Sequence, residues 1–335
     1  MAFQPARCLV VGPSWVGDMV MAQSLFIALQ QRFPALVIDV LAPAWSKPIL
    51  AAMPQVRDAI EMPLQHGELA LTTRYQLGKR LRAHQYDWAI VLPRSLKAAL
   101  VPFWAKIPVR TGYKGEMRYG LLNDIRPLDK SVLTMTVQRF VTLGLPADTA
   151  LPPAITAPRL QVSTSDLAAV QQRFLPSTAP VLALCAGAEY GGAKRWPPQY
   201  FATVAQHWLQ QGGQVLLLGS GKDAPVTAQI ASSVNSPACV DLAGKTSLQE
   251  VMALLAVADK VVSNDSGLMH IAAAVDTPVI ALYGSSDPTY TPPLNDNARI
   301  LSLGLDCSPC FKRECPLGHL DCLRKLEPQQ VISLL

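Results

Sequence analysis

Short apolar runs alternate along this chain with longer segments in which apolar residues recur at three- and four-residue spacing. The short runs are typical of buried strands, and the longer segments have the period of amphipathic helices. The predicted strands are Cys8–Gly12, Leu36–Leu41, Trp88–Leu92, Val181–Cys185, Val215–Leu218, Lys260–Ser263 and Val279–Tyr283. The clearest helices predicted between them are Val20–Phe33, Leu69–His84, Phe201–Gln211 and Leu248–Ala258. This alternation predicts an α/β protein built on parallel sheets.

The alternation is interrupted once, at the proline-rich stretch Leu145–Pro158. Repeated prolines favour an extended linker over a helix or a strand. We therefore expect two Rossmann-like, doubly wound domains, residues 1–155 and 156–335, that face a central cleft. Ligands of such sheets bind at the carboxyl ends of the strands, so those ends are expected to line the cleft.

Length and composition indicate a globular protein. The chain has 335 residues, half of them apolar, which is enough for two domains with a large core each. It contains no apolar run of about eighteen residues, the length that a membrane-spanning helix needs. The first residues also lack the apolar core of a signal peptide. We expect a cytoplasmic protein without a transmembrane segment.

Positive charge is concentrated in the first half of the chain. Residues 1–160 contain 18 Lys and Arg against 10 Asp and Glu, whereas residues 161–335 contain 11 against 14. This asymmetry suggests an anionic partner for the N-terminal domain, such as nucleic acid, a phospholipid surface or a phosphorylated substrate. The alternative is a basic surface that contacts only solvent.

The stretch from Ser263 to His270 has the strongest chemical pattern. The predicted strand ends there in a small, polar turn, and a helix begins near Ser266. Unpaired N–H groups and the helix dipole favour an anion at such a helix start, so Ser266 and Gly267 are predicted to bind a phosphate or diphosphate. His270 lies one turn into this helix, where its imidazole either holds the turn or contacts the phosphate.

A second strand–turn–helix lies near the N-terminus, from Gly12 to Asp18. Its glycines have the spacing of a P-loop, but Asp18 and Met19 stand where nucleotide binding needs Lys and Ser or Thr, so an NTPase is disfavoured. The chain also lacks the dinucleotide pattern G-x-G-x-x-G at this point. Asp18 is interpreted as a general base, and the alternative is a carboxylate that only stabilises the helix dipole.

Lys194 follows the predicted strand Val181–Cys185 across a glycine-rich loop and precedes a helix that begins at Pro197–Pro198. Its compact charge suits a phosphate, and the alternative is a solvated loop. Asp223, after the next strand, is a candidate for ribose hydroxyls. Thr246 is either a ligand contact or, like Ser247, a helix cap.

Basic residues of the first half provide candidates for an anionic acceptor. Arg94 and Lys97 follow the strand Trp88–Leu92 at its carboxyl end, and Lys114 and Arg118 come later in the same half. The basic residues of the helix Leu69–His84 are interpreted as a solvated face.

Seven cysteines occur, and four of them are close in sequence: Cys307, Cys310, Cys315 and Cys322. Their spacing matches no standard zinc or iron–sulfur motif. Reduced thiols in a packed loop or an occasional disulfide are favoured, with a structural metal site as the alternative.

Several motifs together resemble the lipopolysaccharide heptosyltransferases of glycosyltransferase family 9. They are Gly12-Pro-Ser-Trp-Val-Gly-Asp-Met19, Ala42-Pro-Ala-Trp45, Gly115-Glu-Met-Arg-Tyr-Gly-Leu-Leu-Asn-Asp124, Lys194-Arg-Trp-Pro197, Asn264-Asp-Ser-Gly-Leu-Met-His270 and Tyr283-Gly284. The resemblance covers nearly the whole chain in the family's motif order. It implies the GT-B architecture, an acceptor-binding N-terminal domain and a nucleotide-sugar-binding C-terminal domain.

The resemblance also implies the reaction. An inverting enzyme of this family moves L-glycero-D-manno-heptose from ADP-heptose to the inner-core heptose of heptosyl-Kdo2-lipid A, at the inner face of the inner membrane. By resemblance, Asp18 is the base and Lys194, with the amides near Ser266 and Gly267, stabilises the departing ADP. Asp265 would hold sugar hydroxyls, Asp223 the ribose and the Thr246 region the adenine. The chain has no Asp-x-Asp metal motif, so we expect neither a metal ion nor a cofactor, and no nucleic acid as partner.

The sequence leaves alternatives to this function open. A family member could add a different core heptose, and a two-domain protein that binds a nucleotide sugar without turnover is a candidate from another class. An epimerase or dehydrogenase is disfavoured by the missing dinucleotide pattern. Product formation from ADP-heptose separates an enzyme from a binder.

Overall fold

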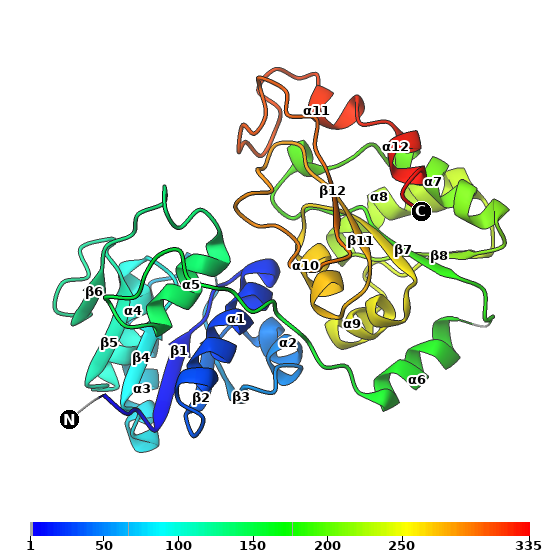
Figure 1. Ribbon diagram of the computed structural model, residues 1–335. Coiled ribbons are helices and arrows are strands. Elements are labelled where there is room, and N and C mark those ends of the chain that lie inside the picture. Colours follow the sequence, from blue (N-terminus) through cyan, green and yellow to red (C-terminus); the bar gives the residue numbers. More distant parts are fainter. Residues whose placement is uncertain (1–2, 66, 176) are drawn as a thin grey trace. The chain divides into compact units, whose positions relative to one another are not determined.

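Each half of the chain folds around a parallel sheet of six strands with helices packed against it (Figure 1). The computed structural model describes residues 3–65, 67–175 and 177–335. It divides into two units, Met1–Pro158 and Arg159–Leu335, each with its own core. The predicted parallel α/β class is confirmed in both units.

The first unit contains β1 to β6 in the sheet order β3-β2-β1-β4-β5-β6. The strands are β1 (Arg7–Val11), β2 (Val37–Ala42), β3 (Val56–Glu61), β4 (Trp88–Val91), β5 (Val109–Tyr113) and β6 (Asp124–Arg126). The helices are α1 (Val16–Arg32), α2 (Lys47–Ala51), α3 (Leu71–Leu81), α4 (Leu96–Trp104) and α5 (Thr136–Gly144), with short 3-10 turns at Ala44–Ser46 and Arg82–His84.

Alternation along the strands gives this sheet two apolar faces. Leu9 and Val11 of β1 belong to a core cluster with residues of α3 and α4, and Cys8 and Val10, which alternate with them along the strand, are also fully buried. Helix α1 packs against α5. Its first turn carries Asp18 and its last turn Arg32, the arrangement that the helix dipole favours. The sheet is therefore covered on both sides, as in a doubly wound fold.

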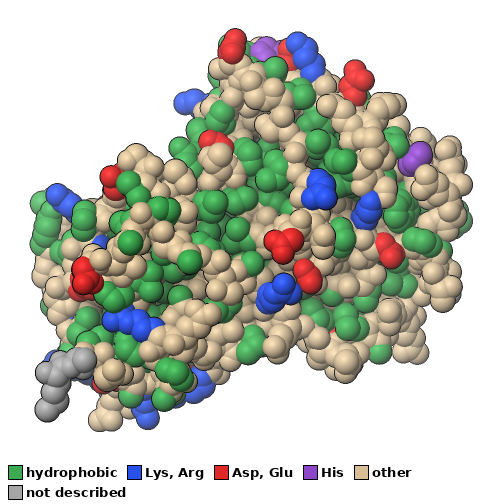
Figure 2. All heavy atoms as spheres, viewed as in Figure 1, with side chains coloured by type: hydrophobic (Ala, Val, Ile, Leu, Met, Phe, Trp, Pro, Cys, Tyr) green, Lys and Arg blue, Asp and Glu red, His purple; other side chains and the backbone are tan. Residues whose placement is uncertain are grey.

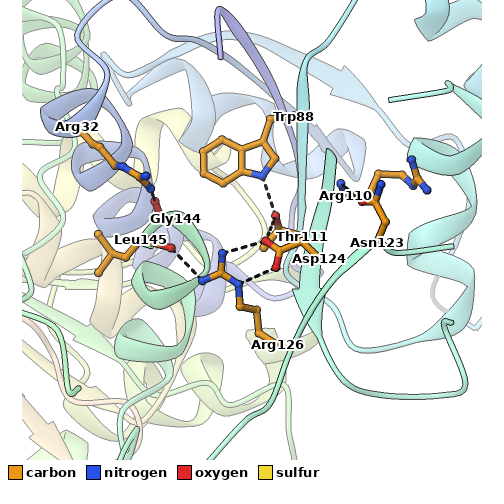
Figure 3. Close-up of polar contacts among 9 residues, drawn as sticks. All are labelled: Arg32, Trp88, Arg110, Thr111, Asn123, Asp124, Arg126, Gly144 and Leu145. Atoms are coloured by element: carbon orange, nitrogen blue, oxygen red, sulfur yellow. Dashed lines mark hydrogen bonds and ion pairs between the residues drawn. The ribbon is translucent and has the colours of Figure 1, made fainter. Parts of the chain in front are cut away.

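A polar network fixes the end of this unit to its sheet (Figure 3). Arg126 of β6 pairs with Asp124 at 2.9 Å and donates to the Leu145 carbonyl, also at 2.9 Å. Thr111 donates to Asp124 and accepts from the Trp88 indole, both at 2.8 Å. Burial by itself raises the pKa of Asp124, but the hydrogen bonds from Arg126 and Thr111 outweigh it and hold the pKa below its usual value. Consequently, the chain leaves the unit from a fixed point after α5.

The second unit repeats the same topology with β12-β11-β10-β7-β8-β9. Its strands are β7 (Val181–Cys185), β8 (Gln214–Leu217), β9 (Cys239–Asp241), β10 (Lys260–Asn264), β11 (Val279–Leu282) and β12 (Arg299–Leu301). Its helices are α6 (Thr164–Phe174), α7 (Pro198–Gln210), α8 (Ala224–Val234), α9 (Leu248–Val257), α10 (Gly267–Ala274), α11 (Asp321–Arg324) and α12 (Pro328–Ile332), with 3-10 turns at Gly192–Lys194 and Gly221–Asp223.

The core of the second unit is built around Trp196, which shortly precedes α7. Trp196 is fully buried, contacts the Phe201 ring edge to face, and donates its indole N–H to the Leu326 carbonyl at 2.8 Å. The final helix α12 packs against α7. One continuous core therefore lies on this face of the sheet. It contains residues of the strands, of α7 and α8, and of the last segments of the chain.

The strand order reverses once in each sheet, between β1 and β4 in the first and between β7 and β10 in the second. Ligands of doubly wound sheets bind outside the carboxyl ends of the strands at such a reversal. The sequence predictions had not located these points, because strand order depends on pairing between distant segments. The two reversals therefore mark the expected ligand-binding edge of the sheet in each unit.

The strands absent from the sequence prediction are mostly short edge strands. β6, β9 and β12 have three residues each, and β3 carries Arg57, Asp58 and Glu61 on the outside of its sheet. Charged edge positions do not form the apolar run that identifies a central strand. Between α5 and α6, residues 145–163 contain neither helix nor strand.

Candidate functional site

The predicted catalytic acid of the first unit lies where β1 passes into α1. Asp18 is half-buried in the first turn of α1. The helix begins just after the carboxyl end of β1, beside the strand-order reversal, because the chain turns at Gly12–Trp15. A carboxylate at this point is stabilised by the helix dipole and is also placed at the edge of the sheet where ligands bind. Both interpretations of Asp18 are thus compatible with its position.

A cavity of about 670 Å³ opens at the same edge of this sheet. Its lining comes from the segments that follow β1, β2, β3 and β4, and it includes Gly12, Ser14, Trp45, Arg94 and Lys97. Two of the predicted acceptor cations, Arg94 and Lys97, therefore line one cavity together with the turn that precedes α1. On the face drawn in Figure 2, Lys and Arg side chains lie scattered among uncharged and acidic ones, so the cavity is a more specific feature than the overall basic charge.

Arg118 does not fit its predicted role in direct acceptor binding. Its side chain is only 2% exposed. The guanidinium donates to the Pro93 carbonyl at 2.7 Å and to the Tyr113 carbonyl. Burial lowers its pKa to about 10, so it stays protonated at neutral pH. Arg118 ties the segment that precedes Arg94 to the end of β5, and we assign it a positioning role.

Arg74 corrects the interpretation of the basic helix as a solvated face. It is buried, and its guanidinium donates to three carbonyls, those of Leu69 at 2.6 Å, Glu68 at 3.0 Å and Lys97 at 3.3 Å. It also lines the cavity described above. The helical spacing of the basic residues did not show that this one points inward.

In the second unit, Lys194 and Asp265 form one cluster. The Lys194 Nζ lies 2.5 Å from the Asp265 carboxylate, and both side chains are largely buried. The Ser286 hydroxyl donates to the same carboxylate oxygen at 2.5 Å. Lys194 comes from the loop after β7, Asp265 follows β10, and Ser286 follows β11. The sequence predictions singled out the first two separately and missed Ser286.

Asn264 connects the two loops that carry this cluster. It is fully buried at the end of β10. Its side-chain oxygen accepts from the Trp196 amide at 3.1 Å, and its nitrogen donates to the Ala186 carbonyl at 2.7 Å. Because these partners lie before and after Lys194, one side chain fixes both ends of the lysine-bearing loop. The sequence signals for it were its polar side chain at the end of an apolar strand and its place in the motif Asn264–His270.

Helix α10 begins at Gly267, directly beside the cluster, with Ser266 in extended conformation as its N-cap. The Ser266 hydroxyl lies 3.2 Å from that of Ser263 and makes no side-chain cap hydrogen bond. The N-terminus of an eight-residue helix and the Lys194 ammonium therefore adjoin Asp265 at the reversal between β7 and β10. This is the geometry that the sequence predicts for an anion site.

His270 is buried one turn into α10. Burial lowers its pKa to about 4, with nearby Asp265 opposing the shift and Lys194 adding to it. The imidazole is therefore neutral at physiological pH. A neutral ring can donate one hydrogen bond to a phosphate but cannot contribute a charge.

Asp223 and Thr246 have structural contacts at their predicted positions, and the Thr246 hydroxyl donates to the Leu242 carbonyl at 3.5 Å. The Asp223 carboxylate accepts from the Ser220 amide at 2.9 Å and from its hydroxyl at 2.8 Å. A Cβ on Gly187 would lie 2.3 Å from the Asp223 Cγ, so the loop after β7 approaches this carboxylate closely. Helix α9 is capped by Ser247, which accepts from the Glu250 amide, and not by Thr246.

The cysteine-rich segment lies against Gly284, just after β11. The Ser308 hydroxyl donates to the Gly284 carbonyl at 2.5 Å, and a Cβ on Gly284 would meet the Leu323 side chain at 2.6 Å. Burial raises the pKa of the Cys322 thiol, and the Cys307, Cys310 and Cys315 thiols raise it further. All are free thiols. Within residues 3–65, 67–175 and 177–335, no group of three or more His, Cys, Asp or Glu is arranged to hold a metal ion.

None of the helices in the described part of the chain is both long and apolar enough to cross a bilayer.

Comparison with known proteins adds to this geometry. Residues 74–321 match the family model glycosyltransferase family 9 (heptosyltransferase). The chain is 46% identical to lipopolysaccharide heptosyltransferase 2 of Salmonella typhimurium, over 98% of this chain and 97% of that one. It is 51% identical to lipooligosaccharide heptosyltransferase 2 of Haemophilus influenzae, over 88% of each chain. The solved structure of E. coli ADP-heptose LPS heptosyltransferase II superposes with a TM-score of 0.88 at 42% identity, over 98% of this chain and 97% of that one.

Proposed function

The chain belongs to glycosyltransferase family 9, the heptosyltransferases, and on that premise we propose that it transfers L-glycero-D-manno-heptose from ADP-heptose to the inner-core heptose of heptosyl-Kdo2-lipid A. The observation that carries the proposal is the near-full-length similarity to heptosyltransferases 2. The two reversal points, one with an acid and one with an anion site, are what a two-substrate transferase of the GT-B architecture needs.

Donor binding is assigned to the second unit. The N–H groups at the start of α10, around Ser266 and Gly267, and the Lys194 ammonium would bind the diphosphate. An ammonium has three N–H donors, so Lys194 can keep its contact with Asp265 and still donate to a phosphate oxygen. The remaining proposed donor contacts are Asp265 to the sugar hydroxyls, Asp223 to the ribose, Thr246 to the adenine and the neutral His270 to a phosphate oxygen.

Acceptor binding is assigned to the first unit. Its cavity at the end of β1, β2 and β4 is lined by Arg94 and Lys97, which suit an anionic lipid A core. Asp18 acts as the general base in this proposal. A carboxylate that takes the proton from an attacking hydroxyl contributes a factor of about 10² to 10⁴ to the rate.

The proposed reaction is a single displacement. An acceptor hydroxyl oxygen bonds to the anomeric carbon of the donor heptose while its proton passes to Asp18. The bond from that carbon to the phosphate oxygen breaks, and ADP leaves with the electron pair. Because the attack comes from the side opposite to the leaving group, the anomeric configuration inverts. The α10 N-terminus and Lys194 stabilise the charge that develops on ADP.

Contact with the membrane surface is proposed for the loop after β5. Met117 and Tyr119 are 82% and 62% exposed there. They line a shallow cavity of about 510 Å³ together with Arg94 and Lys114. Apolar and aromatic tips flanked by cations suit the interface of an anionic membrane. A lipid A acceptor would bring this unit to the inner face of the inner membrane.

The acceptor assignment is tested by incubating the protein with ADP-heptose and either heptosyl-Kdo2-lipid A or Kdo2-lipid A. Mass spectrometry should detect one added heptose on the first acceptor and none on the second. Addition to Kdo2-lipid A alone would assign the chain to a different core heptose, and binding of ADP-heptose without any product would indicate a binding protein.

The membrane assignment has its own test. Replacement of Met117 and Tyr119 by Ser should reduce sedimentation with vesicles of anionic phospholipid. The matched control is Leu317→Ser, which changes a side chain of similar exposure, 61%, in the second unit. Equal sedimentation of all three proteins would refute the proposed contact.

A further inference from the structure

The segment that carries the cysteines packs against the loop that carries Lys194. We define the arm as residues 306–320, between β12 and α11, and the lysine loop as residues 186–197, between β7 and α7. The contacts between them are the Tyr190 hydroxyl to the Phe311 carbonyl at 2.9 Å, the Ala193 amide to the Arg313 carbonyl at 2.9 Å, and the Gly192 amide to a Glu314 carboxylate oxygen at 3.2 Å. The arm is further bound to the end of β11 by the Phe311 amide, which donates to the Ser285 carbonyl at 2.7 Å.

Glycine is required where the arm and the loop meet. Gly191 has a φ of +156°, and a Cβ there would lie 2.3 Å from the Arg313 carbonyl oxygen. A larger residue would push the arm away from the loop. The backbone of Arg313 is therefore held in place next to the residues that lead into Lys194.

The side chain of Arg313 shares an aromatic ring with Lys194. The Arg313 guanidinium carbon lies 5.3 Å from the centre of the Tyr190 ring, and the Lys194 Nζ lies 5.2 Å from the same centre. Both distances are within the range in which a cation is attracted by a ring. Two positively charged side chains thus lie near the Tyr190 ring, beside the predicted anion site.

The two cations differ in their electrostatic partners. Lys194 forms an ion pair with Asp265 at 2.5 Å, which leaves that pair with no net charge. Arg313 forms no ion pair with any carboxylate of the described residues. Two acids of the arm and the loop have other partners, because Glu314 accepts from the Gly192 amide and Glu189 pairs with Lys222 at 2.6 Å. Arg313 is thus a cation beside the lysine loop that has no ion-pair partner among the described residues.

A sugar diphosphate carries a negative charge on each phosphate, and departing ADP gains a further one. A neutral Lys194–Asp265 pair and one helix N-terminus supply little net positive charge for this purpose. An arginine can bind two phosphate oxygens through its planar fork, which a lysine cannot do. Arg313 is exposed, so its side chain is accessible to a ligand.

We propose that Arg313 is a second cation for the donor diphosphate, held beside Lys194 on the ring of Tyr190. The proposal rests on the assignment of donor binding to this unit. In the complex, the guanidinium donates to oxygens of the diphosphate and neutralises charge that Lys194, paired with Asp265, leaves unbalanced. The cysteine-bearing arm then has a role in the reaction, since it carries this side chain to the site.

The test compares Arg313→Ala with the matched control Lys312→Ala, which removes the neighbouring exposed charge of the same arm. ADP and adenosine affinities are measured by calorimetry or ligand competition, and the KM for ADP-heptose by transfer assay. Arg313→Ala should weaken ADP binding and raise the donor KM by about tenfold or more, the effect of one charge-assisted hydrogen bond. Adenosine binding should be unchanged, because adenosine has no phosphate, and Lys312→Ala should bind ADP within about twofold of the unmodified protein.

Two further variants test the ring. Tyr190→Phe keeps the ring and removes only the hydrogen bond to Phe311, so it should bind ADP more tightly than Tyr190→Leu, which removes the platform for both cations. Arg313→Lys should recover part of the lost affinity, because it restores the charge without the planar fork.

The inference is overturned if Arg313→Ala binds ADP as tightly as the unmodified protein, or if it weakens adenosine and ADP equally, which would indicate a distorted loop. These outcomes can be distinguished from failure of the proposed function. If the proposed function is wrong, the unmodified protein itself will form no heptosylated product.

Discussion

The ammonium of Lys194 and the carboxylate of Asp265 meet at 2.5 Å although 71 positions separate them in the chain. The pair forms because β7 and β10 are neighbours at the point where the strand order of the second sheet reverses. Asp265 holds the ammonium beside the N-terminus of α10, and Ser286 holds Asp265. The N–H donors of Lys194 are thereby oriented before a ligand arrives, which is how an enzyme reduces the reorganisation that charge development requires.

Removal of that charge should reduce catalysis more than folding. We expect Lys194→Met to lower kcat/KM for ADP-heptose by a factor of about 10² to 10³, the effect of removing one group that stabilises a developing anion. Lys194→Arg should retain more activity, because the charge remains. The measurement is steady-state kinetics together with a thermal unfolding curve, and a loss of activity that follows a loss of folded protein would contradict this role.

Replacement by Ala should affect acceptor binding at Arg94 and protein stability at Arg118. Arg94→Ala should raise the KM for the acceptor and leave the free energy of unfolding nearly unchanged, because Arg94 lines a cavity. Arg118→Ala should lower the free energy of unfolding by about 3 kcal/mol, since hydrogen bonds from a buried charged group to two backbone carbonyls are lost. Chemical denaturation and acceptor kinetics on both variants check this pair. Equal effects of both changes on stability would refute the distinction between the two residues.

Acid should destabilise the protein partly through His270. Its folded-state pKa, about 4, lies below the value of about 6.5 expected in the unfolded chain. Between these values the unfolded state binds the proton and the folded state does not, so stability falls as the pH drops from about 6.5 towards 4.

The corresponding experiment is urea unfolding of the unmodified protein and His270→Gln at pH 7 and pH 5. The variant should lose less stability between the two pH values. His207→Gln is the control, because it removes a titratable group that lies outside the core on α7. A pH dependence that is identical in all three proteins would show that His270 is not responsible.

Buried elements were the part of the fold that the sequence determined best. Residues 181–185 were predicted as a strand with the bounds that β7 has, because five successive apolar residues have few other places in a folded protein. β3 was missed, since its charged residues at the sheet edge have no apolar period. The start of α1 was predicted four residues late, because Val16 and Gly17 give no strong helix signal.

The candidate site, like the fold, could be predicted from the sequence only in part. Lys194, Asp265 and Ser266 could be identified singly, since each follows a strand. The sequence could not show that these three residues lie together, because their proximity depends on which strands are neighbours in the sheet. Arg118 was expected to contact an anionic acceptor together with the other basic residues of the first half. Only the tertiary structure shows that it is buried and that two of its guanidinium nitrogens donate to backbone carbonyls at the end of β5 and beyond β4.

The role of Asp18 is central to the proposed transfer reaction, and kinetics of Asp18→Asn test it most directly. Amide substitution keeps the shape of the side chain and removes its ability to accept the acceptor's proton. We expect kcat to fall by a factor of about 10² to 10⁴, with the ADP dissociation constant within about twofold of its original value, while Asp58→Asn, at an exposed position on β3, retains full turnover. Unchanged kcat in Asp18→Asn would contradict the assignment of the base.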